Sequence, residues 1–369
     1  MNANQIALPA VYVRGGTSRA VIFKKSDLPD DRTEWPPIFR SVLGSPDPQS
    51  SQLDGLGGGT TSLSKVAVLS PSEREGIHVD YLFVQVEPQT GDLLFDANCG
   101  NVSSAIGPFA VDEGWVKPDD TGCARVRIYN ENSRKLIEST FNICPKPQDL
   151  IEISGVAGRA APILLRFEEP EGSMGPAALP TGARIDRLEL ANGRVIEATL
   201  FDANVPCAIV SATDVGITGY ESTAQLQSNA AYMELVSEIR VASALKMALC
   251  STEYEAREIV KNVPDVVVVS APTVATAAIT ARFVSCDRPH RAAPVTSSMA
   301  LAAASKIPGT IAARFTPEQT SEMVRIEHPT GFVDVIVELA EDGHVAATST
   351  YRTARRIMQG QVLVPAPQL

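Results

Sequence analysis

The chain has 369 residues, of which 44% are hydrophobic and 20% are charged, and its 32 basic and 43 acidic side chains give a net charge of −11 at pH 7. This length and composition indicate a globular protein of two domains rather than one. The acidic balance argues against nucleic acid or an anionic membrane as a partner, since both attract basic surfaces. An anionic substrate would therefore have to be held by a local cluster of donors.

Neither the cysteines nor the chain start indicates secretion or a metal site. The six cysteines are scattered, without a CxxC pair or a Cys/His spacing suited to zinc. The first residues, MNANQIALPAVYV, lack a basic start followed by a long apolar core, so no signal peptide is indicated. No apolar run approaches the ~20 residues that span a bilayer. We therefore expect reduced thiols, no metal and a cytoplasmic protein.

Short strands separated by turn signals are predicted through the first half of the chain. Helical patterning is confined there to about residues 35–43 and to the small-residue segment after Cys99. Because helices do not alternate with the strands, a doubly wound parallel sheet is disfavoured. The predicted strands cover residues 6–13, 20–23, 65–69, 78–86, 123–129, 136–142 and 163–167.

Two glycine-bracketed polar loops, RGGTSR and GGGTTSLSK, are candidates for walls of one pocket. In the first, Arg14, Thr17 and Ser18 flank glycines that bare N–H groups, which suits carboxylate binding, although a tight hairpin is the commoner explanation. The second is no dinucleotide or phosphate loop, because no strand–helix pair flanks it and the Gly-Lys-Ser/Thr ending is missing. At its end stand Ser64 and Lys65. Lys65 is either a solvated strand-end lysine or a pocket-edge lysine whose desolvation leaves a neutral amine as a base.

The segment DANCGN, residues 96–101, is the most informative in the chain. It ends a strand-like stretch and opens the helix predicted from VSSAIGPFAV. Cys99 would lie where unpaired N–H groups and the helix dipole favour its thiolate. Gly100 allows close approach of a ligand, and Asn98 and Asn101 add polar groups. A buried, unreactive thiol is the ordinary fate of a cysteine, but these neighbours favour a functional Cys99.

A second strand-rich half follows a Gly/Pro-rich crossover at residues 168–182, so the domains are predicted as residues 1–184 and 185–369. The two halves of the chain contain similar sequence patterns. AVYVRGGTSRAVIFKKSDL and ATLFDANVPCAIVSATDV share a strand, polar loop, strand and turn, and CGNVSSAIGPFAV has a counterpart in VTSSMALAAASKIPGTI. A longer helix is predicted over about 231–249 and a strand over 266–272. We interpret this as a duplication, with a ligand cleft between two β-rich domains that each surround one helix.

Candidates in the second half gather before and at its small-residue helix. Arg282 and His290 lie in ARFVSCDRPHR, where each could be a surface charge or, beside a helix start, a carboxylate clamp. Thr296 and Ser297 stand at the helix start itself. With only four histidines in the chain, a histidine-centred triad is poorly supported.

These motifs together resemble the PrpF-type isomerases, a family with the diaminopimelate-epimerase-like fold. The resemblance implies an α+β fold of two pseudo-symmetric, β-barrel-like domains, each wrapped around a central helix, with the active site between them. It leaves open whether the last strand packs back on the first domain. The matching segments run almost end to end and include VRGGTSRAVIF, GSPDPQSSQLDGLGGGTTSLSKVAVL, VDYLFVQV, NCGNVSSAIGPFAVDEGWV, LPTG, SKIPGT, EHPTGFVDV and YRTARRIMQGQV.

The resemblance also implies isomerisation of small unsaturated di- or tricarboxylates without a cofactor. It places the proton-transfer residues on Lys65 in TSLSK and on Cys99 in NCGN. The residues expected to bind the substrate are Arg14, Thr17, Ser18, Ser64, Gly100, Asn101, Arg282, His290, Thr296 and Ser297.

One departure from the wider fold bears on the mechanism. Racemases and epimerases of this architecture use two thiols, one at the start of each central helix. Here Thr296 and Ser297 stand where the second thiol would be required, so two-thiol inversion is disfavoured unless Cys207 or Cys286 reaches that face. One thiol and one amine fit a 1,3-allylic proton shift instead.

The substrate expected first is 4-oxalomesaconate, in a Δ-isomerase or tautomerase reaction of aromatic-ring catabolism. Two alternatives stay open: cis-trans isomerisation of 2-methylaconitate in propionate catabolism, and a non-catalytic accessory protein that binds a ligand in the same cleft. The oligomeric state also stays open, with a homodimer as one option.

Overall fold

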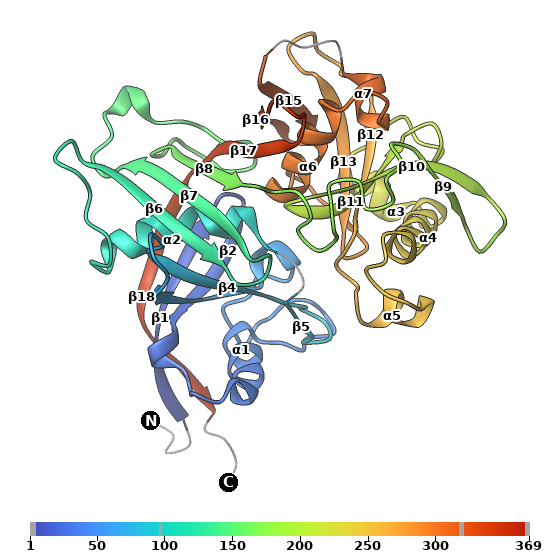
Figure 1. Ribbon diagram of the computed structural model, residues 1–369. Coiled ribbons are helices and arrows are strands. Elements are labelled where there is room, and N and C mark those ends of the chain that lie inside the picture. Colours follow the sequence, from blue (N-terminus) through green and yellow to red (C-terminus); the bar gives the residue numbers. More distant parts are fainter. Residues whose placement is uncertain (1–4, 96–97, 317–320, 366–369) are drawn as a thin grey trace.

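The computed structural model describes residues 5–95, 98–316 and 321–365 and shows two lobes that are joined by strands (Figure 1). Asp96 and Ala97, the first two residues of the DANCGN segment, lie outside this range. The eighteen strands of the described part belong to one hydrogen-bonded network. No described helix is long and apolar enough to cross a membrane.

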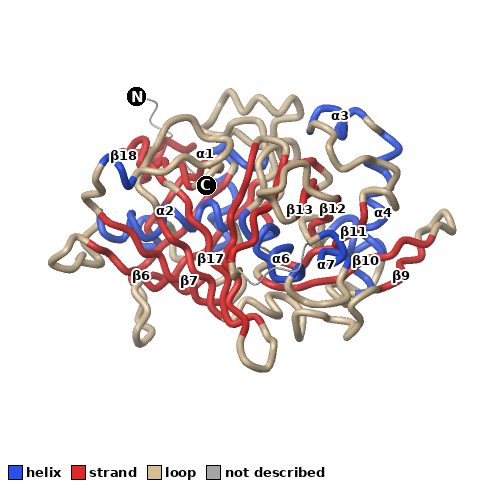
Figure 2. The backbone as a smooth tube through the Cα atoms, turned by 90° about the horizontal axis from the view of Figure 1, so that it is seen from above, coloured by secondary structure: helices blue, strands red, loops and turns tan. Residues whose placement is uncertain are grey.

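The first lobe consists of strands around one buried helix, α2 (Gly100–Asp112), which lies among them in Figure 2. Small residues let the strands approach this helix closely: a Cβ at Gly107 would lie 2.5 Å from Ser139 Oγ. The amphipathic helix α1 (Trp35–Leu43) covers the outer face of the sheet. The strands of this lobe are β1 (Gln5–Gly15), β2 (Ser18–Lys24), β3 (Lys65–Pro71), β4 (Val79–Val86), β5 (Leu93–Leu94), β6 (Cys123–Asn130), β7 (Lys135–Asn142), β8 (Ile163–Glu168) and β18 (Ala354–Pro365).

The second lobe repeats this plan around α6 (Val295–Ser305), whose side chains are all buried. Its sequence VTSSMALAAAS offers only small or apolar side chains, so no face of the helix requires water. Helix α4 (Ala230–Lys246) covers the outer face of the sheet. The strands of this lobe are β9 (Asp186–Glu189), β10 (Val195–Ala203), β11 (Val205–Ser211), β12 (Asp265–Ser270), β13 (Ile279–Ser285), β14 (Arg288–Pro289), β15 (Met323–His328), β16 (Gly331–Leu339) and β17 (Val345–Arg352). The shorter helices are α3 (Thr223–Ser228), α5 (Glu253–Glu258) and α7 (Ile311–Phe315).

The two lobes share one strand order. In the first, β1 pairs with β2 antiparallel, β2 with β3 parallel, and β3 with β4 antiparallel. In the second, β10, β11, β12 and β13 pair in the same sequence of directions. The first register pair of β2 and β3 is Ala20 with Lys65, and that of β11 and β12 is Cys207 with Asp265. Lys65 and Asp265 therefore occupy equivalent positions in the two lobes.

The strands β8 and β17 link the two lobes. β8 pairs with β17 from Ile163–Arg352 to Glu168–Ala347, which joins the sheet of one lobe to that of the other. After β17 the chain returns to the first lobe, where β18 pairs with β1 along its whole length (Figure 1). One apolar cluster contains buried residues of both lobes.

The elements predicted from sequence are confirmed at their places. Each predicted strand of the first half is present, and the small-residue helix begins at Gly100, directly after Cys99. The helix predicted over 231–249 ends earlier, at Lys246, because Ala248 takes a left-handed φ of 56°. The crossover predicted at residues 168–182 begins at Glu168, the last residue of β8, and beyond it holds only an isolated bridge at Glu171.

Candidate active site

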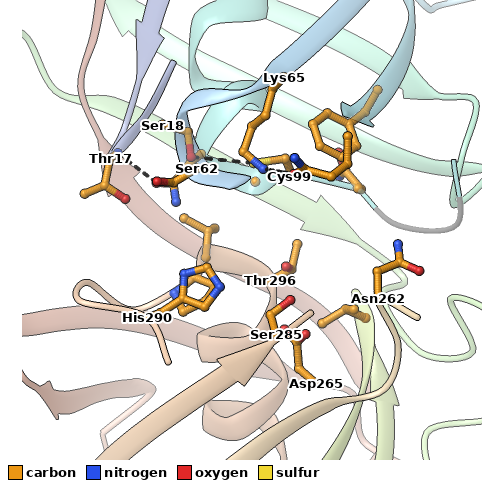
Figure 3. A pocket seen from close by; sticks show the side chains of 18 of the residues that line it. Thr17, Ser18, Ser62, Lys65, Cys99, Asn262, Asp265, Ser285, His290 and Thr296 are labelled. Carbon is orange, nitrogen blue, oxygen red and sulfur yellow. Dashed lines mark hydrogen bonds between the residues drawn. The ribbon is translucent and has the colours of Figure 1, made fainter. Parts of the chain in front are cut away.

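A cavity lies between the lobes and is lined by residues of both, and such interfaces between lobes are common places for small-molecule sites. Figure 3 shows its two walls: Thr17, Ser18, Lys65 and Cys99 come from the first lobe, and His290, Thr296, Ser285 and Asp265 from the second. Its lining residues are Thr17, Ser18, Ser62, Lys65, Phe83, Gln85, Asn98, Cys99, Gly100, Asn101, Val205, Asn262, Asp265, Ser285, Cys286, His290, Ala292, Pro294, Val295 and Thr296.

Lys65 begins β3 and is 8% exposed. Its Nζ donates to Gln85 Oε1 at 2.6 Å and lies 5.0 Å from the centre of the Phe83 ring. The Gln85 amide is held in turn, because its Nε2 donates to the carbonyl oxygens of Thr61 and Ser64, both at 3.1 Å. The side-chain nitrogen of Lys65 is thus held at the cavity wall by the oxygen of a neutral amide.

Cys99 is the residue immediately before α2 and is half-buried. Its Sγ lies 4.0 Å from Ser18 Oγ, a contact drawn in Figure 3. The first hydrogen bond of α2 runs from Ser103 N to Cys99 O at 3.0 Å, so the N–H groups of Gly100 and Asn101 have no partner within the helix. The positive end of α2 therefore faces the cavity beside the thiol.

The RGGTSR loop is pressed against the start of α2. Thr17 N donates to Asn101 Oδ1 at 3.2 Å. Gly16 has a φ of +51°, and a Cβ there would lie 2.0 Å from the same oxygen. Glycine is required because a side chain would both strain the backbone and displace Asn101. The Asn101 side chain thus positions the loop, while its backbone N–H stays at the open helix end.

The second lobe presents an equivalent helix start. α6 begins at Val295 after Pro294, and its first hydrogen bond runs from Ser298 N to Pro294 O at 3.0 Å. A Cβ at Gly100 would lie 2.5 Å from Val295 Cγ1, so the two helix starts meet at the cavity. Two positive helix ends at one cavity favour an anion with more than one negative group.

Asp265, which the sequence analysis did not single out, lies in the second-lobe wall and is 5% exposed. Its Oδ2 accepts a hydrogen bond from Ser297 Oγ. Burial raises the pKa of Asp265 from 3.8 to about 6, against the opposing effects of the Ser297 and Ser285 hydroxyls and the charge of Lys65. Its carboxyl group therefore exchanges protons near neutral pH.

The other titratable groups of this wall stay in one protonation state near neutral pH. Burial, helped by the charge of Lys65, lowers the pKa of His290 to about 4, so this imidazole is neutral. Burial raises the pKa of Cys286 to about 12, so this thiol is protonated. His290 can therefore donate or accept a hydrogen bond but carries no charge toward an anion.

The structure brings most of the predicted site residues to one cavity. Those that line it are Thr17, Ser18, Lys65, Cys99, Gly100, Asn101, His290 and Thr296. The remaining four, Arg14, Ser64, Arg282 and Ser297, are not among the lining residues.

These four side chains are engaged elsewhere. Arg14 Nη1 donates to the carbonyl oxygens of Gly16 and Thr353, both at 2.9 Å. Arg282 Nε donates to the carbonyl oxygen of Glu221 at 2.7 Å. Arg14 thus secures the glycine loop from behind, and Arg282 lies away from the cavity.

Ser64 and Ser297 hold other residues of the walls. Ser64 Oγ donates to Gln52 Oε1 at 2.6 Å and to Thr60 O at 2.9 Å. Ser297, as noted, donates to Asp265. Within the described part of the chain, no three His, Cys, Asp or Glu side chains are grouped so as to hold a metal ion.

Comparison with known proteins agrees with this geometry. The chain is 36% identical to the (4E)-oxalomesaconate Delta-isomerase of Novosphingobium sp. (strain KA1), over 98% of each chain. It is 33% identical to the 3-methylitaconate isomerase of Eubacterium barkeri over 100% of each, and 34% identical to the 2-methyl-aconitate isomerase of Cupriavidus necator over 98% of each.

Two solved structures show the same architecture. A methylitaconate-delta-isomerase superposes with a TM-score of 0.79 at 32% identity, over 98% of this chain and 97% of the other. A hydroxyproline epimerase from Agrobacterium vitis superposes with a TM-score of 0.59 at 11% identity, over 99% and 94%, and shares the fold alone.

The fold is therefore diaminopimelate-epimerase-like, as the resemblance to the PrpF-type isomerases implied, and the cavity between its lobes is where this class of protein is expected to bind a small molecule. The family model described as PrpF protein matches residues 5–365. The chain belongs to the PrpF family and is an isomerase.

Proposed function

We propose that this isomerase catalyses a 1,3-allylic proton shift on an unsaturated di- or tricarboxylate, and that 4-oxalomesaconate is its substrate. The observation that carries the proposal is the cavity itself: a buried lysine and a thiol stand on one wall, at the place where two helix N-termini meet. The helix ends suit a polyanion, and the lysine suits removal of a proton next to a double bond. The 36% identity to an oxalomesaconate isomerase favours that substrate.

In the proposed mechanism Lys65, as the neutral amine, removes a proton from the carbon adjacent to the double bond. The negative charge that develops spreads onto a carboxylate or keto oxygen, where the free N–H groups of Gly100 and Asn101 stabilise it. Thr17 and Ser18 bind a carboxylate. Cys99 delivers the proton to the far carbon or steers that step, since its thiol stands beside Ser18 on the same wall.

The test follows proton NMR spectra in deuterated buffer after the purified protein is added to 4-oxalomesaconate and, separately, to aconitate and 2-methylaconitate. We expect the vinyl signals of 4-oxalomesaconate to move and deuterium to enter its allylic position. Lys65→Met should lower the rate at least 10³-fold, because no other amine lines the described cavity. Wild-type rates in Lys65→Met would exclude Lys65 as the base.

Cys99→Ser separates the two roles considered for the thiol. A hydroxyl keeps the size and hydrogen bonding of the side chain but is a far weaker acid, so an essential proton donor would be lost with it. We expect a loss of about tenfold, much smaller than that of Lys65→Met, as for a residue that steers protonation.

Isomerisation of 2-methylaconitate is the second candidate. Its support is the 34% identity to a 2-methyl-aconitate isomerase over the same share of the chain, close to the 36% of the first candidate. Turnover of 2-methylaconitate with none of 4-oxalomesaconate would replace the first substrate with the second and leave the proton-shift chemistry in place.

A further inference from the structure

Building on the allylic shift proposed above, on which this inference depends, we propose that Asp265 is a second acid–base residue of the reaction. In this role it returns the proton to the substrate from the face opposite Lys65.

The placement of Asp265 is the first reason. Lys65 and Asp265 start equivalent strands, β3 and β12, and hold equivalent register positions in lobes that face one another across the cavity (Figure 3). The neighbouring strands match as well. Gln85 on β4 pairs with Lys65, and Ser285 on β13 follows Val284, the partner of Val266, where its hydroxyl acts to lower the pKa of Asp265. A planar unsaturated substrate between the lobes therefore has Lys65 on one face and Asp265 on the other.

From its position in the structure, Cys99 cannot protonate the substrate on the face opposite Lys65. Its thiol lies beside Ser18, on the wall that also carries Lys65. A proton that Cys99 delivers would reach the substrate from the side on which Lys65 acts. Delivery from the opposite side needs a group of the second lobe.

Three titratable side chains of the second lobe line the described cavity, Asp265, Cys286 and His290, and of these Asp265 has the pKa nearest to neutral pH. His290 stays neutral with a pKa of about 4, and Cys286 stays protonated with a pKa of about 12. Cys207, opposite Asp265 on β11, is fully buried, which raises its pKa well above the usual value. The charge of Lys65 acts to lower the pKa of Asp265.

The substrate itself selects the protonated form of Asp265. An ionised carboxylate would repel a di- or trianion in the same cavity, and a nearby negative charge raises the pKa of a carboxyl group further. Bound substrate thus faces a carboxylic acid that Ser297 holds in place. This explains why an acidic side chain lines a cavity built for an anion.

In the proposed reaction every proton that is removed is also returned, so no further reactant is needed. The C–H bond of the substrate breaks as the Lys65 amine becomes ammonium, and the electron pair spreads over the dienolate. A new C–H bond then forms at the far carbon as the O–H bond of Asp265 breaks and leaves a carboxylate. After the product leaves, one proton passes through solvent from the Lys65 ammonium to the Asp265 carboxylate, which restores the starting enzyme.

Asp265→Asn tests this role by removing the acidic proton while keeping the shape and an acceptor for Ser297. Two rates are measured in deuterated buffer: exchange of the substrate's allylic hydrogen, which needs only Lys65, and conversion to product, which needs both residues. We expect conversion to fall at least 100-fold and exchange to stay within a few-fold of wild type. Lys65→Met should lose both.

The remaining outcomes decide against the role. Conversion within threefold of wild type would show that Asp265 returns no proton. Equal loss of exchange and conversion would show that it acts on deprotonation or binding instead. A wild-type enzyme that shows neither rate would refute the allylic shift itself, before any variant is compared.

Asp186→Asn is the matched control, because Asp186 is also 5% exposed but lies outside the cavity lining. Its ratio of exchange to conversion should equal that of wild type.

Asp265→Ala gives a second, independent readout. Added formate should restore its conversion by supplying a small carboxylic acid in the space left, whereas Asp186→Ala should not respond to formate; no response of Asp265→Ala would contradict the role.

Discussion

Lys65 owes its position to an amide that is itself fixed. Gln85 turns Oε1 toward Lys65 because Nε2 is bound to the carbonyl oxygens of Thr61, Ser64 and Val86. An amide oxygen accepts a hydrogen bond from Nζ without adding a negative charge, whereas a carboxylate there would favour the protonated form of the proposed base. Gln85 is thus a positioning residue whose neutrality matters.

Gln85→Glu should therefore slow turnover at least tenfold at pH 7 and move the acidic limb of the kcat/KM profile to higher pH. The reason is that a carboxylate about 2.6 Å from Nζ leaves less neutral amine at a given pH. The profile between pH 6 and 10 checks this, since a purely structural defect would lower the rate without moving the limb. An unmoved limb would contradict the role given to Gln85.

Individual residues also show which parts of the site could be predicted from the sequence and which could not. Cys99 stood out because Asn98 and Asn101 add polar groups to an apolar stretch, whereas Lys65 was assigned from the resemblance to the PrpF-type isomerases. Asp265 did not, because an acid at the start of the apolar run VVVVS is typical of a solvated strand end. The signal lay in comparing the halves: LSKVAV and VPDVVV place Lys65 and Asp265 at equivalent points. Arg282 looked like a clamp, but only the fold shows that its guanidinium is bound to backbone carbonyls.

At the scale of elements, the starts of α2 and α6 are in direct contact. A Cβ at Gly100 would lie 2.5 Å from Val295 Cγ1 and 2.7 Å from Val295 Cβ. Both residues are first in their helices, and Val295 is 2% exposed, so neither can move into solvent. The spacing of the two helix ends is thus set by one glycine.

Gly100→Ala should destabilise the protein by about 1–3 kcal/mol, as overpacking of a core does, and lower kcat/KM at least tenfold by separating the helix starts. A loss is diagnostic, because alanine in a helix is otherwise favoured over glycine by up to about 1 kcal/mol. Gly360→Ala, with nothing within 4 Å of the added Cβ, is the control. Adding Val295→Ala to Gly100→Ala should recover part of both losses; no recovery would place the defect elsewhere.

The start of β12 carries a cost in stability. The pKa of Asp265 lies above its unfolded value of 3.8, so the native state binds more protons between pH 4 and 6, and stability falls as pH rises through that window. A pKa raised to about 6 corresponds to a cost of about 3 kcal/mol at pH 7.

Asp265→Asn should for this reason raise the free energy of unfolding at pH 7 by up to about 3 kcal/mol and leave it nearly unchanged at pH 4. Urea unfolding of both proteins at the two pH values measures the difference. A gain of equal size at pH 4 would mean that packing of the amide, and not ionisation of Asp265, is responsible.

Helices and strands with strong local sequence patterns were predictable, whereas the short helices α3 and α5 were not predicted. α3 and α5 each begin with a capping box, Ser222 with Gln225 and Thr252 with Glu255, a pattern that is visible in the sequence. The central helices were predictable as helices from their small residues. Their burial on all sides follows only once the strands are placed around them, which is a property of the whole fold.

At the scale of the whole molecule, the lobes are not independent bodies. β8 and β17 make one continuous sheet across them, and β18 carries the C-terminal part of the chain back to β1. One apolar cluster spans both lobes and includes residues of α2 and α6. Removing either lobe would expose the strands and core residues that it shares with the other, so we expect the two predicted domains to unfold together.

Equilibrium unfolding in urea tests this directly, because the chain's two tryptophans, Trp35 and Trp115, both lie in the first lobe. Their fluorescence reports that lobe alone, whereas far-ultraviolet circular dichroism reports the strands and helices of both. We expect the two signals to give one midpoint and one slope, since the shared sheet and core make partial unfolding costly. Separate midpoints would show that the β8–β17 junction opens first, in which case the cavity between the lobes would be lost, and activity would follow the earlier transition.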